Sequence, residues 1–114
     1  MHEMSYITKV VAAASAEAKK QSAPRVEQVE IAVGEMIGAV EELLISCYRE
    51  AVVGTPLEGS KLLIEPVPVT AECLSCRQTY HPDRENDYRC PHCRSVNSRI
   101  TAGRDVVVKN IRLP

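Results

Sequence analysis

The sequence lacks the large aromatic residues that often anchor a hydrophobic core. It has no Trp and no Phe among its 114 residues, and only four Tyr. Hydrophobic residues still make up 45% of the chain, so we expect a core built from Val, Ile, Leu and Ala. Because side chains that stack on bases are this scarce, the composition disfavours a surface for single-stranded nucleic acid.

The sequence also lacks a charge excess and a long apolar run. Its 14 basic and 15 acidic residues give a formal net charge of -1, which provides no electrostatic footprint for nucleic acid. No apolar run reaches the roughly 18 residues that a membrane span needs. The start of the chain has no basic region followed by an apolar stretch, so we expect no secretory signal peptide. These absences predict a cytoplasmic protein with no nucleic-acid or membrane partner.

Four of the five cysteines form two closely spaced pairs. The pairs are Cys73-Leu74-Ser75-Cys76 and Cys90-Pro91-His92-Cys93. Two tight turns with two thiols each supply the four sulfur ligands of a tetrahedral Zn²⁺ site. The alternatives are two disulfides or unrelated core cysteines, and both fit a reducing compartment less well than metal ligation does. Four thiolates leave no open coordination position, so the predicted zinc site is structural and catalyses no reaction.

The rest of the chain alternates between helical and extended patterns. Residues from His2 to about Gln21 and from about Ala39 to Val53 show the periodicity of amphipathic helices. We expect their apolar faces to comprise Met4, Ile7, Val11, Ala14 and Ala18 in the first, and Val40, Leu43, Leu44, Cys47, Tyr48 and Ala51 in the second. Alternating or β-branched runs predict strands within residues 25–36, at 61–65 and at 105–113, with Pro66 and Pro68 favouring an edge or a bend.

This order of elements predicts an α+β fold. We expect a small three-stranded sheet with two helices on one face, and a zinc-ribbon-like module at the tip of a hairpin. The two strands that flank the module are expected to be antiparallel neighbours. The predicted domains are an α/β domain of residues 1–70 and 99–114, and a zinc-binding domain of residues 71–98 inserted between the last two strands.

The first residues offer a second set of metal ligands. The α-amine of Met1, the amide nitrogen of His2 and its imidazole Nδ1 are spaced to form two fused chelate rings. Such a nitrogen set suits square-planar Ni²⁺ or Cu²⁺, and Glu3 would add an oxygen ligand or lie just outside the ligands. Any chain that begins Met-His has these atoms, so on spacing alone a solvated terminal histidine is the simpler interpretation.

The other candidate ligands are weaker. His92 lies between two cysteines of one pair, where we expect a solvent-facing turn residue, and His81 lies in the polar connector between the pairs. Cys47 falls on the apolar face of the second helix, which favours a small buried hydrophobic role over a reactive thiol.

The motifs together resemble the HypA family of hydrogenase nickel-incorporation proteins. The resemblance covers most of the chain. It rests on Met1-His2-Glu3-Met4-Ser5, the strand Val29–Glu35, residues 54–59, the two cysteine pairs, and the closing stretch Gly103–Ile111. The chain departs from the usual pattern at Arg77 and Arg94, which follow the cysteine pairs where Gly is common. A positive φ at these positions would carry an energetic cost.

The resemblance implies a nickel metallochaperone that is not an enzyme. It implies Ni²⁺ bound by Met1, His2 and Glu3, and structural Zn²⁺ bound by Cys73, Cys76, Cys90 and Cys93. It further implies delivery of nickel, with a HypB-type GTPase, to the large subunit of [NiFe]-hydrogenase, by a monomer or weak dimer. Some members of the family also serve urease. The rival hypothesis is a zinc-ribbon module that binds protein or nucleic acid through its arginines and carries no transported metal.

Overall fold

A computed structural model describes residues 2–114, and Met1 lies outside the described residues. The elements, in chain order, are α1 (Glu3–Lys20), β1 (Gln28–Gly34), a short 3₁₀ helix η1 (Glu35–Ile37), α2 (Glu41–Ala51), β2 (Lys61–Val67), β3 (Thr70–Cys73), β4 (Thr79–Tyr80), a 3₁₀ helix η2 (Arg84–Asn86), β5 (Ser98–Ala102) and β6 (Val106–Arg112). Within residues 2–114 no helix has the length and apolar character to cross a membrane. The two predicted long helices and the α+β class are confirmed.

The first sheet has the strand order β2-β1-β6, with β1 in the centre. β1 pairs parallel with β2 and antiparallel with β6. The expectation that the strands flanking the zinc module are neighbours is therefore wrong for β2 and β6, because β1 lies between them. α2 connects β1 to β2, and a helical crossover of this kind returns the chain beside the strand it left. Pro66 is tolerated because β2 is an edge strand.

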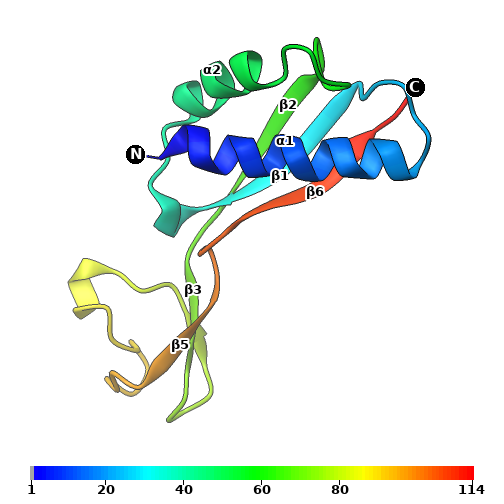
Figure 1. Cartoon of the computed structure of the whole chain (residues 1–114). Helices are drawn as coiled ribbons and strands as arrows, with labels where there is room; N and C mark the ends of the chain where they lie inside the picture. The colour runs from blue at the N-terminus through cyan, green and yellow to red at the C-terminus, as the bar shows by residue number, and fades with distance from the viewer. Residues whose placement is uncertain (1) are drawn as a thin grey trace.

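Both long helices cover one face of this sheet (Figure 1). From α1, the side chains of Ile7, Val10, Val11, Ala14 and Ala18 are buried, and they meet Val29, Ile31 and Val33, the inward residues of β1. α2 contributes Leu44 and Tyr48. The core is aliphatic, as the composition predicts, and Tyr48 is its largest fully buried side chain.

Three residues expected on the apolar faces are not in the core. Met4 is 41% exposed, Val40 45% and Leu43 49%. All three lie near the starts of α1 and α2. These three apolar side chains therefore face solvent, whereas Ile7 and Leu44 beside them are buried.

The second sheet belongs to the cysteine-containing unit and has the order β4-β3-β5. β3 pairs antiparallel with both neighbours, so β3 and β5 form the two arms of the hairpin that carries the cysteine pairs. β5 is not expected from the sequence, because Ser98–Ala102 is short and lacks an apolar alternation. The buried core of this unit is only Ala71, Cys73, Tyr80 and Cys90.

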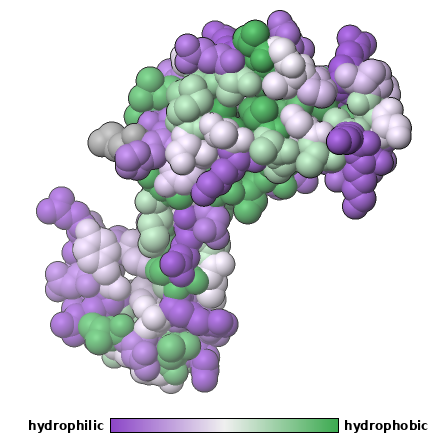
Figure 2. Space-filling model, viewed as in Figure 1, coloured by the Kyte–Doolittle hydropathy of each residue, from purple (hydrophilic) through white to green (hydrophobic). Residues whose placement is uncertain are grey.

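A narrow neck joins the two sheets, as Figures 1 and 2 show, in a molecule of 53 × 26 × 17 Å. Three chain segments cross there with almost no space between their backbones. A Cβ placed on Gly34 would overlap the carbonyl of Gly103, and one placed on Gly103 would lie 2.6 Å from Cα of Val69. Backbone N–H groups of Gly34 and Met36 donate to the carbonyls of Asp105 and Gly103, at 2.8 and 2.9 Å. The neck is a packed joint.

Candidate metal centres

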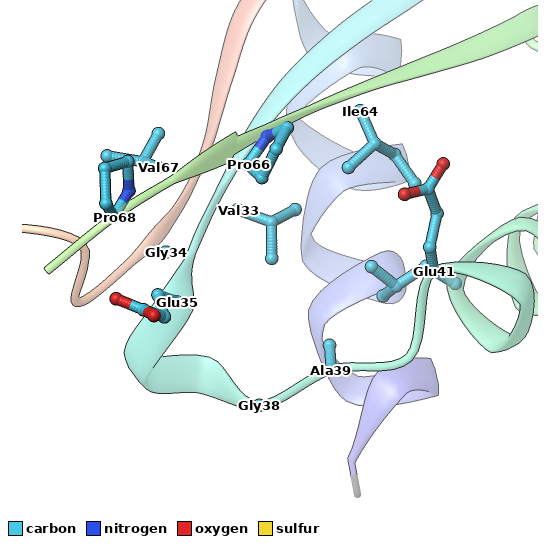
Figure 3. Close-up of a pocket in the computed structure, with 11 residues that line it drawn as sticks. Val33, Gly34, Glu35, Gly38, Ala39, Glu41, Ile64, Pro66, Val67 and Pro68 are labelled. Atoms are coloured by element: carbon cyan, nitrogen blue, oxygen red, sulfur yellow. The ribbon is translucent and has the colours of Figure 1, made fainter.

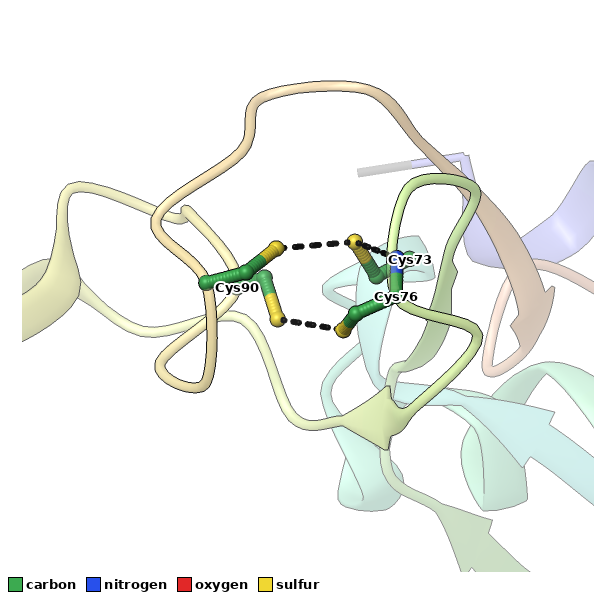
Figure 4. Close-up of side chains that lie close together, drawn as sticks. Cys73, Cys76 and Cys90 are labelled. Atoms are coloured by element: carbon green, nitrogen blue, oxygen red, sulfur yellow. Dashed lines mark hydrogen bonds between the residues drawn. The ribbon is translucent and has the colours of Figure 1, made fainter.

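The four paired cysteines come together at the far end of the second sheet (Figure 4). Their Sγ atoms all lie within 4.8 Å of one another, with Cys73–Cys93 at 3.5 Å and Cys76–Cys90 at 3.6 Å. A disulfide would need about 2.05 Å, and the cysteines are free thiols. Tetrahedral Zn²⁺ with Zn–S bonds of about 2.3 Å spaces its sulfurs by about 3.8 Å. The cluster fits zinc and excludes the disulfide alternative.

Each pair lies on a turn of the same geometry. The N–H of Arg77 donates to the carbonyl of Cys73 at 2.9 Å, and the N–H of Arg94 donates to that of Cys90 at 2.8 Å. Arg77 and Arg94 both have φ of 66°, in the left-handed region that favours glycine. The positive φ considered from the sequence is therefore present at both positions. The hydroxyls of Ser75 and Ser95 lie 2.9 Å apart and link the two turns.

The close packing of the four cysteines shifts the pKa values of their thiols strongly. The pKa of Cys73 is lowered to about 6, chiefly by the backbone N–H of Cys76, whose nitrogen lies 3.5 Å from the sulfur. The N–H of Ser95 lowers the pKa of Cys93, but the neighbouring Cys73 sulfur, burial and the other two thiols outweigh it and raise that pKa to about 12. Four thiolates cannot share this space without a cation. Zn²⁺ would supply that charge, and the four cysteines would lose their remaining protons on binding it.

The second predicted site lies at the start of α1. His2 is exposed and occupies the N-cap position of α1, and Met1 lies outside the described residues. Glu3 is only 7% exposed, although it is in the first turn of the helix. Its carboxylate accepts the backbone N–H of Val40 at 3.1 Å, and this contact is the main reason why the pKa of Glu3 is lowered.

Val40 is the N-cap residue of α2 and has no side-chain cap of its own. In a capping box, a Glu at the third helical position accepts the N–H of the N-cap residue. In α2 that position is Leu43, and Glu3 of the other helix provides the carboxylate instead. Glu3 therefore fixes the beginning of α1, and with it His2, against the beginning of α2. Because the two residues are 37 positions apart, nothing in the sequence pairs them.

The remaining candidates take the structural roles that the sequence favours. His92 is exposed on its turn, and Cys47 is partly buried against the main core. His81 lies away from the cysteine cluster, where its Nδ1 is 2.7 Å from the carbonyl of Val69 in the neck. Glu35 accepts the N–H of Val69 at 2.9 Å, and its carboxylate is 3.9 Å from the His81 ring. Sequence reasoning missed this role of Glu35, although Gly34-Glu35 at the end of an alternating strand marks the position.

Fold and site together define a small α+β protein with an attached four-cysteine unit of the structural zinc type. A family profile described as hydrogenase/urease nickel incorporation, metallochaperone, HypA matches residues 1–113. The chain belongs to the HypA family of nickel-incorporation metallochaperones. The family binds nickel and structural zinc, and the cysteine cluster suits the zinc.

Individual relatives are similar to this chain over almost its whole length. The hydrogenase maturation factor HypA of Picosynechococcus sp. is 34% identical over 113 residues, 99% of each chain. That of Chloroflexus aggregans is 32% identical over 114 residues, 100% of each chain. The solution structure of the Ni metallochaperone HypA from Helicobacter pylori superposes with a TM-score of 0.75 at 25% identity, covering 99% of this chain and 97% of that one.

Proposed function

We propose that this chain captures Ni²⁺ at Met1, His2 and Glu3 and passes it on during hydrogenase maturation. The observation that carries the proposal is that His2 is exposed while the first turn of α1, which follows it, is held in place. The Glu3–Val40 hydrogen bond holds the first turn of α1, while the imidazole of His2 remains open to solvent. The His2 imidazole can therefore bind a metal ion from solvent without any movement of α1.

The chemistry of the ligand set suits a cargo ion. An amine, an amide nitrogen and an imidazole nitrogen bind in one plane and leave the axial directions open. Ligands from an acceptor can enter along those directions before the donor nitrogens leave. Because protons compete for the same nitrogens, nickel affinity should fall as the pH falls. The Glu3 carboxylate would either add an oxygen ligand through Oε1 or lie just outside the ligands, because its Oε2 accepts the Val40 N–H.

In this proposal nickel is transported, whereas zinc is a permanently bound structural ion. Cys73, Cys76, Cys90 and Cys93 would hold it as a closed structural site, which stabilises a unit whose buried core is only four residues. The chain would then act by binding and transferring metal and would not be an enzyme. We propose the same division of labour for the two sheets, the first for nickel and the second for zinc. The predicted domain boundaries, residues 1–70 with 99–114 and residues 71–98, divide β5, which pairs with β3, so the zinc unit is better described as residues 70–102.

We infer that the partners are a HypB-type GTPase and the large subunit of [NiFe]-hydrogenase, met in the cytoplasm by a monomer or weak dimer. The support is the family description, which specifies nickel incorporation into hydrogenase or urease. Curated relatives named as hydrogenase maturation factors favour the hydrogenase route.

The test is a calorimetric Ni²⁺ titration of the zinc-loaded protein and of His2→Ala. His92→Ala is the matched control, because it removes another exposed imidazole that lies on a zinc turn. We expect His2→Ala to lose tight nickel binding and His92→Ala to keep it, with one zinc retained in all three. Equal nickel affinity of wild type and His2→Ala would contradict the proposal. A variant with one extra residue ahead of Met1 separately tests the terminal amine.

A further inference from the structure

A surface pocket lies between the beginning of α2 and the outer edge of the first sheet (Figure 3). It has a volume of about 410 Å³. Ala39 and Leu44 line it from the α2 side, Ile64 and Pro66 line it from β2, and Val33 of β1 also contributes. Because β2 is an edge strand, this side of the pocket is not covered by another strand. The pocket is therefore an apolar hollow open to a partner.

The segment from the end of β1 through the first turn of α2 carries further exposed apolar side chains. The segment that forms one wall also exposes Met36, Val40 and Leu43, at 51%, 45% and 49%. None of the three lines the pocket itself, and Met36 lines a neighbouring one with Val69 and His81. They show that this segment keeps large apolar side chains uncovered beside the pocket residues, as interaction surfaces often do. Val40 is also the residue whose N–H is bound by Glu3, so the pocket adjoins the nickel end of the molecule.

The charge at the rim has a single sign. The charged residues that line the pocket are Glu35 and Glu41, which lie on opposite sides of it in Figure 3, and none of its lining residues is basic. Glu35 is engaged with the N–H of Val69. The Glu41 carboxylate makes no hydrogen bond or ion pair with any of residues 2–114, and Glu42 follows it on the exposed first turn of α2. An apolar hollow with an available carboxylate at its rim complements an apolar side chain that has a cation next to it.

We propose that this pocket docks a segment of a partner protein that presents an aliphatic side chain beside a lysine or arginine. The aliphatic group fills the hollow between α2 and β2, and the cation pairs with Glu41. Docking here brings the partner against the beginning of α1, within reach of the proposed nickel ligands. The proposal relies on the proposed function only for that consequence, and nickel-free protein is sufficient to test it.

The test uses three short peptides and amide chemical shifts of the zinc-loaded, nickel-free protein at about 0.15 M salt, where the Debye length is about 8 Å. The peptides are acetyl-Lys-Leu-Lys-amide, acetyl-Lys-Ser-Lys-amide and acetyl-Glu-Leu-Glu-amide. We expect the first to shift the amides of Gly38, Ala39 and Glu41 with a millimolar Kd, and the other two to bind at least about threefold more weakly.

Two variants distinguish an ion pair between Glu41 and the peptide from a general effect of the protein's charge on binding. Glu41→Lys should weaken the Lys-Leu-Lys peptide about two- to fivefold, the effect of one exposed ion pair. Glu42→Lys is the matched control, because it makes the same charge change in the same helical turn without lining the pocket. Equal effects of the two variants, equal binding of the three peptides, or no shifts at these amides would each overturn the proposal. Shifts of the same amides on dilution without peptide would assign the pocket to a second copy of the chain and overturn it too.

Discussion

Replacing Gly34 with Ala should strain the neck and reorient the zinc unit while leaving every proposed metal ligand untouched. Gly34 has φ -67° and ψ 139°, which alanine adopts without cost, so the effect of the substitution is steric. The added Cβ would overlap the carbonyl of Gly103 and lie 2.8 Å from the backbone nitrogen of Arg104. Restoring an ordinary separation of about 3.5 Å from that nitrogen alone requires the two segments to part by roughly 0.7 Å, and the closer Gly103 carbonyl requires more.

The magnitude follows from the fact that backbone must move. Overpacking that displaces backbone costs about 1–3 kcal/mol. With a urea m-value of about 1.5 kcal/mol/M, a loss of ~2 kcal/mol lowers the unfolding midpoint by about 1.3 M. The assay is urea unfolding followed by far-UV circular dichroism, combined with residual dipolar couplings from amides of both sheets. The couplings should report a changed angle between the sheets, with one zinc still bound.

Gly38→Ala is the control for this experiment. Gly38 has φ 68°, but a Cβ there would meet no atom within 4 Å. It should therefore cost about 1 kcal/mol from the left-handed backbone alone, with no change in the relative orientation of the sheets. If Gly34→Ala kept the wild-type midpoint and orientation, or if Gly38→Ala reoriented the sheets equally, the description of the neck as a packed joint would be refuted.

Three further predictions concern individual contacts. Glu3→Gln should destabilise the protein near pH 7. The difference in stability from wild type should disappear as the pH falls through the lowered pKa of Glu3, because that carboxylate stabilises the fold only while ionised. Thermal melts at a series of pH values check this, with Glu50→Gln as the exposed control. Arg77→Gly should relieve a φ of 66° and stabilise the zinc unit by about 1 kcal/mol, seen as slower zinc loss to a chelator than in Arg89→Gly. Complete chelation of zinc should collapse the amide dispersion of residues 70–102 while the first sheet keeps its own, since only the latter has a large aliphatic core.

Each of these has a clear contrary result. A constant stability difference between Glu3→Gln and wild type down to pH 2 would show that the carboxylate contributes by packing alone. Faster zinc loss from Arg77→Gly would show that the arginine side chain matters more than its backbone conformation. Retained dispersion in residues 70–102 after chelation would show that the second sheet holds its fold without metal.

Local patterns in the sequence predicted much of the fold. The periodicity of α1 and α2 and the alternation of β1 and β6 reflect burial on one face, and each element occurs within a few residues of its expected bounds. The order of strands could not be predicted this way. A pattern shows that a strand has a buried face, but it does not show which strand lies beside it, and β1 between β2 and β6 is a property of the whole chain.

The candidate sites also combine features that local sequence patterns predict with contacts that they do not. The spacing of the cysteine pairs predicted a cluster that the structure confirms, because two-residue gaps fix the turn geometry locally. The contact of Glu3 with Val40 and the crossing of Gly34, Gly103 and Val69 join residues far apart in the chain. No local pattern records such contacts, so the features that hold the two proposed metal sites in place became visible only in three dimensions.

The measurement that tests the central claim most directly is the metal content of the intact protein by native mass spectrometry. It compares wild type, His2→Ala and Cys76→Ser, each with and without added Ni²⁺. The account predicts one zinc and one nickel in wild type, one zinc and no nickel in His2→Ala, and loss of zinc with nickel retained in Cys76→Ser. Nickel that stays bound in His2→Ala, or that disappears together with zinc in Cys76→Ser, would contradict the separation of a transported metal from a structural one.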